Sequence, residues 1–107
     1  MKISVIVPIY NMENFIARTI SCLQEQEEPN LEFLLVNDGS TDSTLSLMQK
    51  MCEGDARFQI FTMKNRGYGS ACNFGIRQAS GDYFAIFEPD DFIPHDFYSS
   101  LRKIAER

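Results

Sequence analysis

The chain alternates continuous apolar runs with segments of helical periodicity, and this alternation limits its fold more than any other feature. The runs cover residues 3–7, 33–36, 58–61 and 83–87. Runs with little polar alternation are typical of strands covered on both faces, as in parallel sheets. The run at 58–61 alternates better at its start, so we expect it nearer an edge. Four strands of a mainly parallel sheet are therefore predicted.

Apolar residues recur at helical spacing between the runs and after the last one. The four stripes are Ile16, Ile20 and Leu23; Leu45, Met48 and Cys52; Cys72, Gly75, Ile76 and Ala79; and Phe97, Leu101, Ile104 and Ala105. Ser40, Thr41 or Asp42 can cap the second helix, Gly81 can end the third, and Pro94 suits the first turn of the fourth. The order β-α-β-α-β-α-β-α, with right-handed crossovers, predicts a three-layer α/β/α fold with a mainly parallel sheet.

Length and charge narrow the possibilities further. A chain of 107 residues forms one domain or less, because domains typically hold about 100–150 residues. Four strands of such a sheet leave an edge that needs cover, so we interpret residues 1–107 as a single unit truncated to about half of a domain. The formal net charge of −5 is opposite in sign to that of polyanion-binding proteins, and this excludes a nucleic-acid partner.

Cysteine usage and hydropathy indicate the compartment. Cys22, Cys52 and Cys72 are an odd number without metal-ligand spacing, so we expect buried free thiols in a reducing environment. No stretch approaches the roughly 18–20 apolar residues that cross a bilayer. Met1 leads straight into a strand pattern, which argues against a signal peptide. A cytoplasmic location, including the cytosolic face of a membrane, is expected.

Polar clusters directly follow three of the predicted strands, at residues 8–11, 37–42 and 88–91. Parallel strands end at one rim of a sheet, where open α/β sheets bind ligands, so the clusters should share a site. Acids at this rim indicate a nucleotide and a divalent metal. The first cluster lacks glycine, which excludes a dinucleotide-binding turn and a P-loop. Pro8 and Thr62 stand where phosphoacceptor receiver domains place acids, which excludes that class too.

Each candidate residue also has a structural interpretation. Asp38 either satisfies local backbone donors in a turn or accepts a hydrogen bond from the imide N–H of a nucleobase. Tyr10 either lies half-buried with its hydroxyl in water or stacks on that base. Asp42 is most simply a residue that stabilises the start of a helix.

The same choice applies to the acids Glu88, Asp90 and Asp91. They form either a solvated turn that caps the fourth helix or a cation site, because carboxylates this close repel one another unless a cation or good solvation compensates. Hard oxygen ligands suit Mg²⁺ or Mn²⁺. Gly67 and Gly69, between the third strand and the third helix, either permit close backbone approach to a ligand or belong to an ordinary loop.

Jointly, these motifs resemble the amino-terminal half of family 2 glycosyltransferases with the GT-A nucleotide-sugar fold, from Ile3 to about Ile104. Residues 4–11 resemble the opening strand of that family. Residues 36–42 match its V-D-D-G-S-T-D motif with Asn37 at the first acidic place, and residues 67–75 are similar to G-x-S-x-A-R-N-x-G. Residues 81–83 followed by 87–91 resemble the strand that leads to the D-x-D-D metal motif.

The resemblance implies a donor site. The residues that it assigns to the nucleotide-sugar are Pro8, Tyr10, Asn11, Asp38, Gly69 and Asp91. Tyr10 and Asp38 would hold the base, usually uracil, and Asp91 would help to position the sugar-phosphate end. Asp90 would bind Mn²⁺ or Mg²⁺, with Glu88 near the metal or the ribose. Two departures bear on the donor: Glu88 replaces the customary Asp, and Cys72 stands where the family often has an Arg.

The implied reaction is inverting, metal-dependent transfer of a sugar, of hexosyltransferase type, from a UDP-sugar to the hydroxyl of a saccharide or lipid-linked acceptor. The resemblance implies polysaccharide biosynthesis for a cell wall or capsule, and leaves a glycolipid open as the product. A divalent cation would act as a Lewis acid on the departing diphosphate. The general base of this family lies beyond Arg107, so no catalytic residue is expected in the chain and it should be inactive alone.

Two alternatives belong to other classes. The chain could be a non-catalytic nucleotide-binding or scaffold module derived from this fold, with self-association or a protein partner along the open sheet edge. It could also be a nucleotidyltransferase on a related fold, but the glycine-rich segment that such enzymes carry after the first strand is absent.

Overall fold

The computed structural model describes residues 2–89 and 93–105, which form alternating strands and helices. In chain order they are β1 (Ile3–Ile9), α1 (Ile16–Gln24), β2 (Leu31–Asp38), α2 (Thr44–Met51), β3 (Phe58–Met63), α3 (Tyr68–Gln78), β4 (Tyr83–Ile86) and α4 (Phe97–Ala105). The strands form one parallel sheet in the order β3-β2-β1-β4. The predicted α/β class, element order and edge position of the third strand are confirmed.

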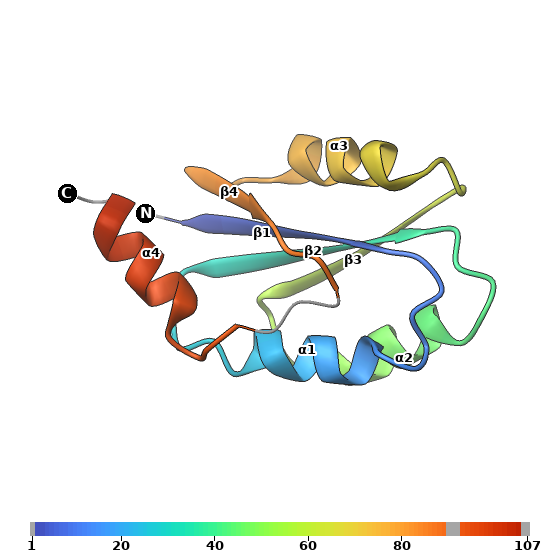
Figure 1. Ribbon diagram of the computed structural model, residues 1–107, viewed down its shortest axis with the longest axis horizontal. Helices are drawn as coiled ribbons and strands as arrows, with labels where there is room; N and C mark the ends of the chain where they lie inside the picture. The colour runs from blue at the N-terminus through green and yellow to red at the C-terminus, as the bar shows by residue number, and fades with distance from the viewer. Residues whose placement is uncertain (1, 90–92, 106–107) are drawn as a thin grey trace.

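The sheet is the middle layer of three (Figure 1). Helix α3 lies on one face, α1 and α2 lie on the other, and α4 lies beside the end of the sheet at which β1 begins. None of the helices in the described ranges combines the length and the apolar character needed to span a bilayer. The interpretation of residues 1–107 as half of one domain stays a prediction.

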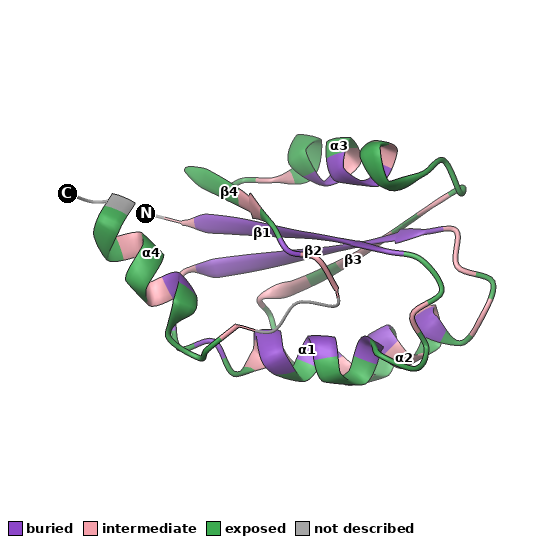
Figure 2. Cartoon of the chain, in the orientation of Figure 1, coloured by how far each residue is buried: buried purple, intermediate pink, exposed green. Residues whose placement is uncertain are grey.

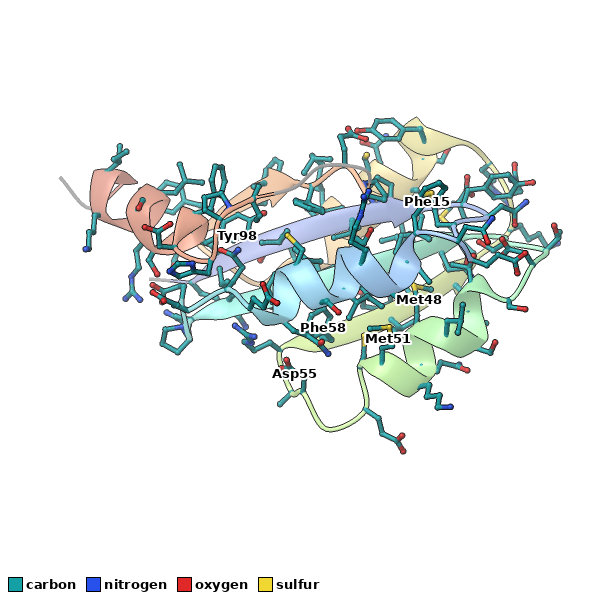
Figure 3. All side chains as sticks on the ribbon, turned by 60° about the horizontal axis from the view of Figure 1, so that its bottom comes forward. Phe15, Met48, Met51, Asp55, Phe58 and Tyr98 are labelled. Carbon is teal, nitrogen blue, oxygen red and sulfur yellow. The ribbon has the colours of Figure 1, made fainter. Side chains whose placement is uncertain are left out.

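Strands β1 and β2 form the centre of the core and are buried along their whole length (Figure 2). Because helices cover both of their faces, neither strand needs polar alternation, which explains the continuous apolar runs. Val5, Val7 and Phe33 belong to the cluster that faces α1 and α2. Side chains of α2 and α4, among them Met48, Met51 and Tyr98, help to fill that layer (Figure 3).

On the opposite face, α3 approaches the sheet closely because residue 75 is a glycine. A Cβ atom at Gly75 would lie 2.5 Å from Cγ2 of Ile6 on β1 and 3.3 Å from Cγ2 of Val36 on β2. Gly75 therefore sets the depth at which the third helix sits on the two central strands. The three cysteines are buried and free, as predicted.

Two expectations about the apolar elements are wrong. β4 was expected to be covered on both faces, but Tyr83 and Phe84 are 49% and 55% exposed, because β4 is an edge strand with α4 displaced from it. In α4 the predicted stripe residues Phe97, Leu101 and Ile104 are 37%, 37% and 60% exposed, whereas Tyr98 is buried. The Tyr98 N–H donates to Oε1 of Gln26, and this bond orients the helix.

The predicted helix boundaries also need correction. The residue preceding α2 is Ser43, but its side chain makes no cap bond, and the predicted candidate Asp42 accepts the Thr44 N–H instead. Helix α3 ends at Gln78, and Ala79 adopts an extended backbone instead of a glycine cap. Gly81 has a different purpose: a Cβ atom there would lie 2.6 Å from the Ser4 hydroxyl and 2.8 Å from the Lys2 carbonyl oxygen.

A buried carboxylate joins the strands at the amino-terminal end of the sheet. Glu32 on β2 accepts hydrogen bonds from the Ser4 hydroxyl at 2.5 Å and from the Ser80 N–H at 2.7 Å, and Nζ of Lys2 lies 3.4 Å away. Desolvation acts to raise the pKa of Glu32, but the hydrogen bonds from Ser4 and Ser80, together with Lys2, outweigh it and lower the pKa from 4.5 to about 2. The charged form is thus stabilised by folding.

Replacing this carboxylate should make the fold less stable and less sensitive to acid. A lowered pKa in the folded state contributes stability above pH 4.5 that is lost as the pH falls toward 2. Glu32→Gln should therefore lower the free energy of unfolding by about 2–3 kcal/mol near neutral pH. Urea unfolding at neutral pH and near pH 3 measures both effects. The exposed Glu53→Gln is the control and should change neither; a neutral-pH stability equal to wild type in Glu32→Gln would contradict the assignment.

Two glycines of α3 provide a matched pair for the packing of this helix. Gly75→Ala should destabilise the chain by about 1–3 kcal/mol, because the new methyl group overlaps Ile6 and the core must shift. Gly69→Ala meets no atom within 4 Å and should be neutral or stabilising by up to about 1 kcal/mol, since alanine favours helix. Thermal unfolding of both variants measures the difference. Equal melting temperatures would refute the role of Gly75 in the packing of α3.

Candidate functional site

The described residues of the three polar clusters, 8–11, 37–42 and 88–89, gather at the carboxyl-terminal rim of the sheet, as the strand order requires. Register pairs Ile9 of β1 with Asn37 of β2, so Tyr10 and Asp38 leave their strands side by side. β4 pairs with β1 up to Ile6, and the Phe87 N–H donates to the Ile6 carbonyl oxygen at 2.8 Å. The chain after β4 therefore reaches the same rim, although it lies far from the other two clusters in the sequence.

A hollow of about 430 Å³ lies at this rim. It is lined by Pro8, Ile9, Tyr10, Met12, Asp38, Asn65, Gly67, Tyr68, Ala71, Glu88 and Pro89. These residues come from the ends of β1 and β2, the segment from β3 into α3, and the segment after β4. The volume falls within the range of small-molecule and cofactor sites. The predicted convergence of Asp38 and the acidic segment on one hollow holds for Glu88, whereas Asp90 and Asp91 lie outside the described residues.

Asp38 has a role that neither sequence interpretation described. Its two carboxylate oxygens accept the backbone N–H groups of Arg66 at 2.8 Å and Gly67 at 2.9 Å, and the residue is only 4% exposed. The donors are distant in sequence, so this is not a local turn. Each carboxylate oxygen has a second lone pair, which leaves acceptor capacity toward the hollow. Asp38 thus positions the β3–α3 loop and can still meet a ligand.

Asn11 does not line the hollow, but it connects two loops at the rim through hydrogen bonds. Its backbone has a positive φ of 48°, a conformation that asparagine tolerates better than most residues. Its N–H donates to the Ser40 hydroxyl at 3.0 Å, and its Oδ1 accepts the Thr41 N–H at 2.8 Å. The loops after β1 and β2 are therefore held together by Asn11.

Asp42 has the structural role that the sequence suggested, at the start of α2. Its carboxylate accepts the N–H of Thr44 at 2.9 Å and the N–H of Glu13 at 3.3 Å. Desolvation acts to raise the pKa of Asp42, but the hydrogen bonds from Thr44 and Glu13 prevail and lower it. Glu13 in turn accepts the Ser43 N–H at 2.9 Å, so the two loops exchange hydrogen bonds.

Tyr10 and Tyr68 are both about half exposed at the hollow. The Tyr68 hydroxyl donates a hydrogen bond to Oε1 of Glu88, joining the first turn of α3 to the segment after β4. This bond, followed by desolvation, raises the pKa of Tyr68, so the phenol stays a neutral donor. Sequence reasoning missed Tyr68 as a site residue. Its position between Gly67 and Gly69, in a loop already singled out, was the available signal.

Cys72 lies one helical turn after Tyr68 on the buried side of α3. Burial raises the pKa of its thiol; the hydrogen bond with Tyr68 acts the other way, and the nearby Glu88 raises it further. Cys72 is therefore a neutral thiol, and it contributes no positive charge beside Glu88. Gly69 is exposed and is not among the residues that line the hollow.

Glu88 is the described residue best suited to a metal. It brings a hard oxygen ligand to the wall of the hollow, and a neutral hydroxyl is its hydrogen-bond partner. Within residues 2–89 and 93–105, no three His, Cys, Asp or Glu side chains come together as a metal-binding group.

Comparison with known proteins identifies related sequences. Residues 4–107 match the sequence model of glycosyl transferase family 2. Glycosyltransferase GlyA of Streptococcus pneumoniae is 37% identical over 106 residues, which cover 98% of this chain and 15% of GlyA. An uncharacterized glycosyltransferase of Rickettsia bellii is 41% identical over 95 residues, covering 89% of this chain and 14% of that protein.

Solved structures of glycosyltransferases share the fold of this chain. TarS 1-349 of S. aureus, in complex with UDP-GlcNAc, superposes with a TM-score of 0.85 at 31% identity, over 99% of this chain and 30% of TarS 1-349. The mannosyltransferase PcManGT of Pyrobaculum calidifontis, in complex with GDP-Man and Mn²⁺, superposes with a TM-score of 0.81 at 30% identity, over 87% of this chain and 28% of PcManGT. The chain thus spans less than a third of each of these proteins.

The role assigned to Asp38 predicts a local effect of its replacement. In Asp38→Asn the amide has one oxygen in place of two, so one of the N–H groups of Arg66 and Gly67 loses its acceptor. Amide hydrogen exchange at one or both positions should accelerate by about tenfold, corresponding to roughly 1–1.5 kcal/mol. Asp82→Asn, which alters a carboxylate bonded to the Lys2 N–H at the opposite end of the sheet, should leave both amides unchanged. Unaltered exchange in Asp38→Asn would refute the role.

Proposed function

Because this chain belongs to glycosyl transferase family 2, we propose that it supplies the donor-binding part of an enzyme that transfers a sugar from a UDP-sugar to an acceptor hydroxyl. The observation that carries the proposal is the single hollow of about 430 Å³ to which Tyr10, Asp38 and Glu88 each contribute from a different strand end. The UDP-GlcNAc bound by TarS and the GDP-Man bound by PcManGT support a nucleotide-sugar ligand of this kind.

Asp38 selects among the bases in this proposal. A carboxylate can accept a hydrogen bond from the imide N–H of uracil or guanine, whereas adenine carries no such group. Its oxygens keep spare lone pairs after binding Arg66 and Gly67. Tyr10, which is 47% exposed at the rim, provides a ring on which the base can stack. We prefer uracil, in agreement with the family resemblance.

The remaining nucleotide-sugar residues shape and complete this site. Pro8 lines the hollow, and Asn11 holds the adjoining loop through Thr41. Gly69 would permit backbone approach at the start of α3. Asp91 would act at the sugar-phosphate end.

Glu88 and Asp90 would hold a divalent cation, Mn²⁺ or Mg²⁺. The fit rests on Glu88, a carboxylate at the wall of the hollow that receives a hydrogen bond from the neutral Tyr68 hydroxyl. A cation there would stabilise the negative charge that develops on the departing diphosphate. Tyr68 would orient the Glu88 carboxylate, and Tyr10 and Asp38 would fix the base. PcManGT was solved with Mn²⁺, which supports a divalent cation.

The transfer would proceed with inversion and is of hexosyltransferase type in this proposal. A carboxylate must take the proton of the acceptor hydroxyl, and we propose that it is not contributed by this chain, which spans 15% of GlyA. The 107-residue chain alone would then bind donor without transferring sugar. We place the reaction in the cytoplasm or at the cytosolic face of a membrane, in polysaccharide synthesis for a cell wall or capsule. The exposed edge strand β4 would allow self-association.

Calorimetric titration of the 107-residue chain tests donor binding. UDP should bind more tightly in the presence of Mn²⁺ than in EDTA, GDP more weakly than UDP, and ADP least, because adenine offers no imide N–H to Asp38. Failure of all three nucleotides to bind a folded sample would refute the donor site. Tight binding of another protein with no nucleotide binding would favour a scaffold module instead.

Metal ligation is tested separately. Glu88→Gln and Asp90→Asn should each remove most of the enhancement by Mn²⁺, about tenfold or more, while leaving the weaker metal-free binding of UDP intact. Glu53→Gln, an exposed acid on the segment after α2, is the matched control and should titrate as wild type. If Mn²⁺ enhances UDP binding in both variants as much as in wild type, Glu88 and Asp90 are not metal ligands. The assignment of Asp38 would be unaffected.

A further inference from the structure

A second hollow lies on the other side of the β3–α3 loop. It has a volume of about 320 Å³ and is lined by Met63, Lys64, Arg66, Ser70, Asn73, Phe74 and Arg77. None of these residues lines the hollow at the sheet rim. The two hollows are therefore distinct, and the site proposed for the nucleotide does not account for this one.

The position of α3 on the sheet creates this hollow. Helix α3 packs on β1 and β2, with Ala71, Cys72 and Gly75 as its buried residues. β3 is the edge strand beyond β2, and the hollow lies between the end of β3 and the side of α3 that carries Phe74. Ser70, Asn73, Phe74 and Arg77 follow helical spacing and form a stripe along that side. The wall of the hollow is thus made of regular structure.

Three cations surround the hollow without a partner. Within the part of the chain that the structure describes, the side chains of Lys64, Arg66 and Arg77 form no hydrogen bond or ion pair, and all three residues are exposed. Arg57, by contrast, bonds to Asp55 and to backbone carbonyls. The chain has 10 Lys and Arg against 15 Asp and Glu, so three unpaired cations around one hollow oppose the overall charge.

Like charges around a hollow repel one another, and an anion between them would relieve that repulsion. Arginine binds phosphate and carboxylate groups through paired N–H groups, and Lys64 adds a point charge. The Ser70 hydroxyl and the Asn73 amide add neutral donors on the same wall. The polar part of this hollow has the chemistry of an oxyanion site.

The remaining wall is apolar. The Phe74 ring meets the ring of Phe61 on β3 edge to face, with 5.5 Å between centroids, so that ring is held in place. Met63 lines the hollow beside it. A fixed aromatic ring next to cationic groups suits a ligand with a flat, partly apolar face and an acidic substituent, and a sugar ring bearing a phosphate or carboxylate has both.

We propose that the hollow between α3 and the end of β3 binds an acidic saccharide unit, a sugar that carries a phosphate or a carboxylate, outside the nucleotide site. Arg66, Arg77 and Lys64 bind the acidic group, and Phe74 contacts the sugar ring. The saccharide part of this assignment rests on the proposed function, whereas the anion-binding part rests on the charges alone. No metal is needed, because the cations of the protein neutralise the ligand.

The test is an NMR titration of the ¹⁵N-labelled 107-residue chain with glucose 6-phosphate in EDTA. Chemical-shift changes that saturate with ligand concentration are expected at the backbone amides of Lys64, Arg66, Ser70, Asn73 and Arg77. Glucuronate should shift the same amides, neutral glucose should not, and inorganic phosphate should bind more weakly than glucose 6-phosphate because it lacks the ring that contacts Phe74.

Charge-neutral variants make the test specific. Arg77→Gln and Lys64→Gln should each weaken glucose 6-phosphate binding by about fivefold, because each removes one of three converging charges. Lys50→Gln removes an exposed charge from α2 on the opposite face of the sheet and should change the affinity by less than about twofold. Equal effects of all three variants would mean non-specific attraction and would overturn the proposal. Equal affinity for inorganic phosphate and glucose 6-phosphate would overturn its saccharide part.

Nucleotide binding separates this proposal from the proposed function. In one outcome, UDP shifts the amide resonances of Tyr10 and Tyr68, but glucose 6-phosphate causes no shifts around the second hollow. This result would overturn the second site and would still support the donor site. Glucose 6-phosphate binding at Lys64 and Arg77 without any binding of UDP would support the anion site and count against the donor site.

Discussion

The parallel pairing of β1 with β2 on one side and with β4 on the other is the constraint on which the rest of the structure depends. Parallel neighbours end at the same rim, so residues that follow three strands must meet there. Burial of β1 and β2 on both faces fixes this register, because a slip by one residue would exchange the side chains that face α3 with those that face α1 and α2. The chemistry of the rim is therefore a consequence of core packing.

Hydrogen bonds between loops convert that rim into a site. Asp38 holds the β3–α3 loop through two N–H groups, and Asn11 holds the loop after β2. The Tyr68 hydroxyl reaches Glu88 and links α3 to the segment after β4. Buried polar groups need partners, and Asp38 finds them in a neighbouring loop instead of its own. The hollow is thus shaped before any ligand enters.

The two ends of the sheet use carboxylates differently. At the amino-terminal end, Glu32 is buried among Ser4, Ser80 and Lys2, so its charge contributes to the stability of the fold. At the carboxyl-terminal rim, Glu88 is partly exposed and has a neutral partner in Tyr68. The hydrogen bonds to Glu32 favour its charged form in the folded state, whereas a carboxylate that faces a hollow remains available to a ligand. The same residue type serves the fold at one end and the site at the other.

The order, type and approximate limits of the eight elements in the described residues were predictable, because continuous apolar runs and helical spacing are local patterns. The exposure of β4 and α4 was not predictable, because their sequences do not reveal which of their faces pack against another element. Tyr98 is buried, and Phe97, Leu101 and Ile104 of the predicted stripe are exposed, since contacts such as the bond from Tyr98 to Gln26 and the ion pair of Arg102 with Glu28 help to orient α4.

For the site, the sequence by itself determined that acids follow the ends of strands and therefore share one rim of the sheet. Only the tertiary structure decided that Asp38 binds the N–H groups of Arg66 and Gly67, which lie 28 and 29 positions away, and that Tyr68 meets Glu88. It also placed three cations of the β3–α3 region around a second hollow. Local spacing specifies which elements form, but contacts between distant residues depend on how closely α3 sits on the sheet, and the absence of a side chain at Gly75 helps to set that distance.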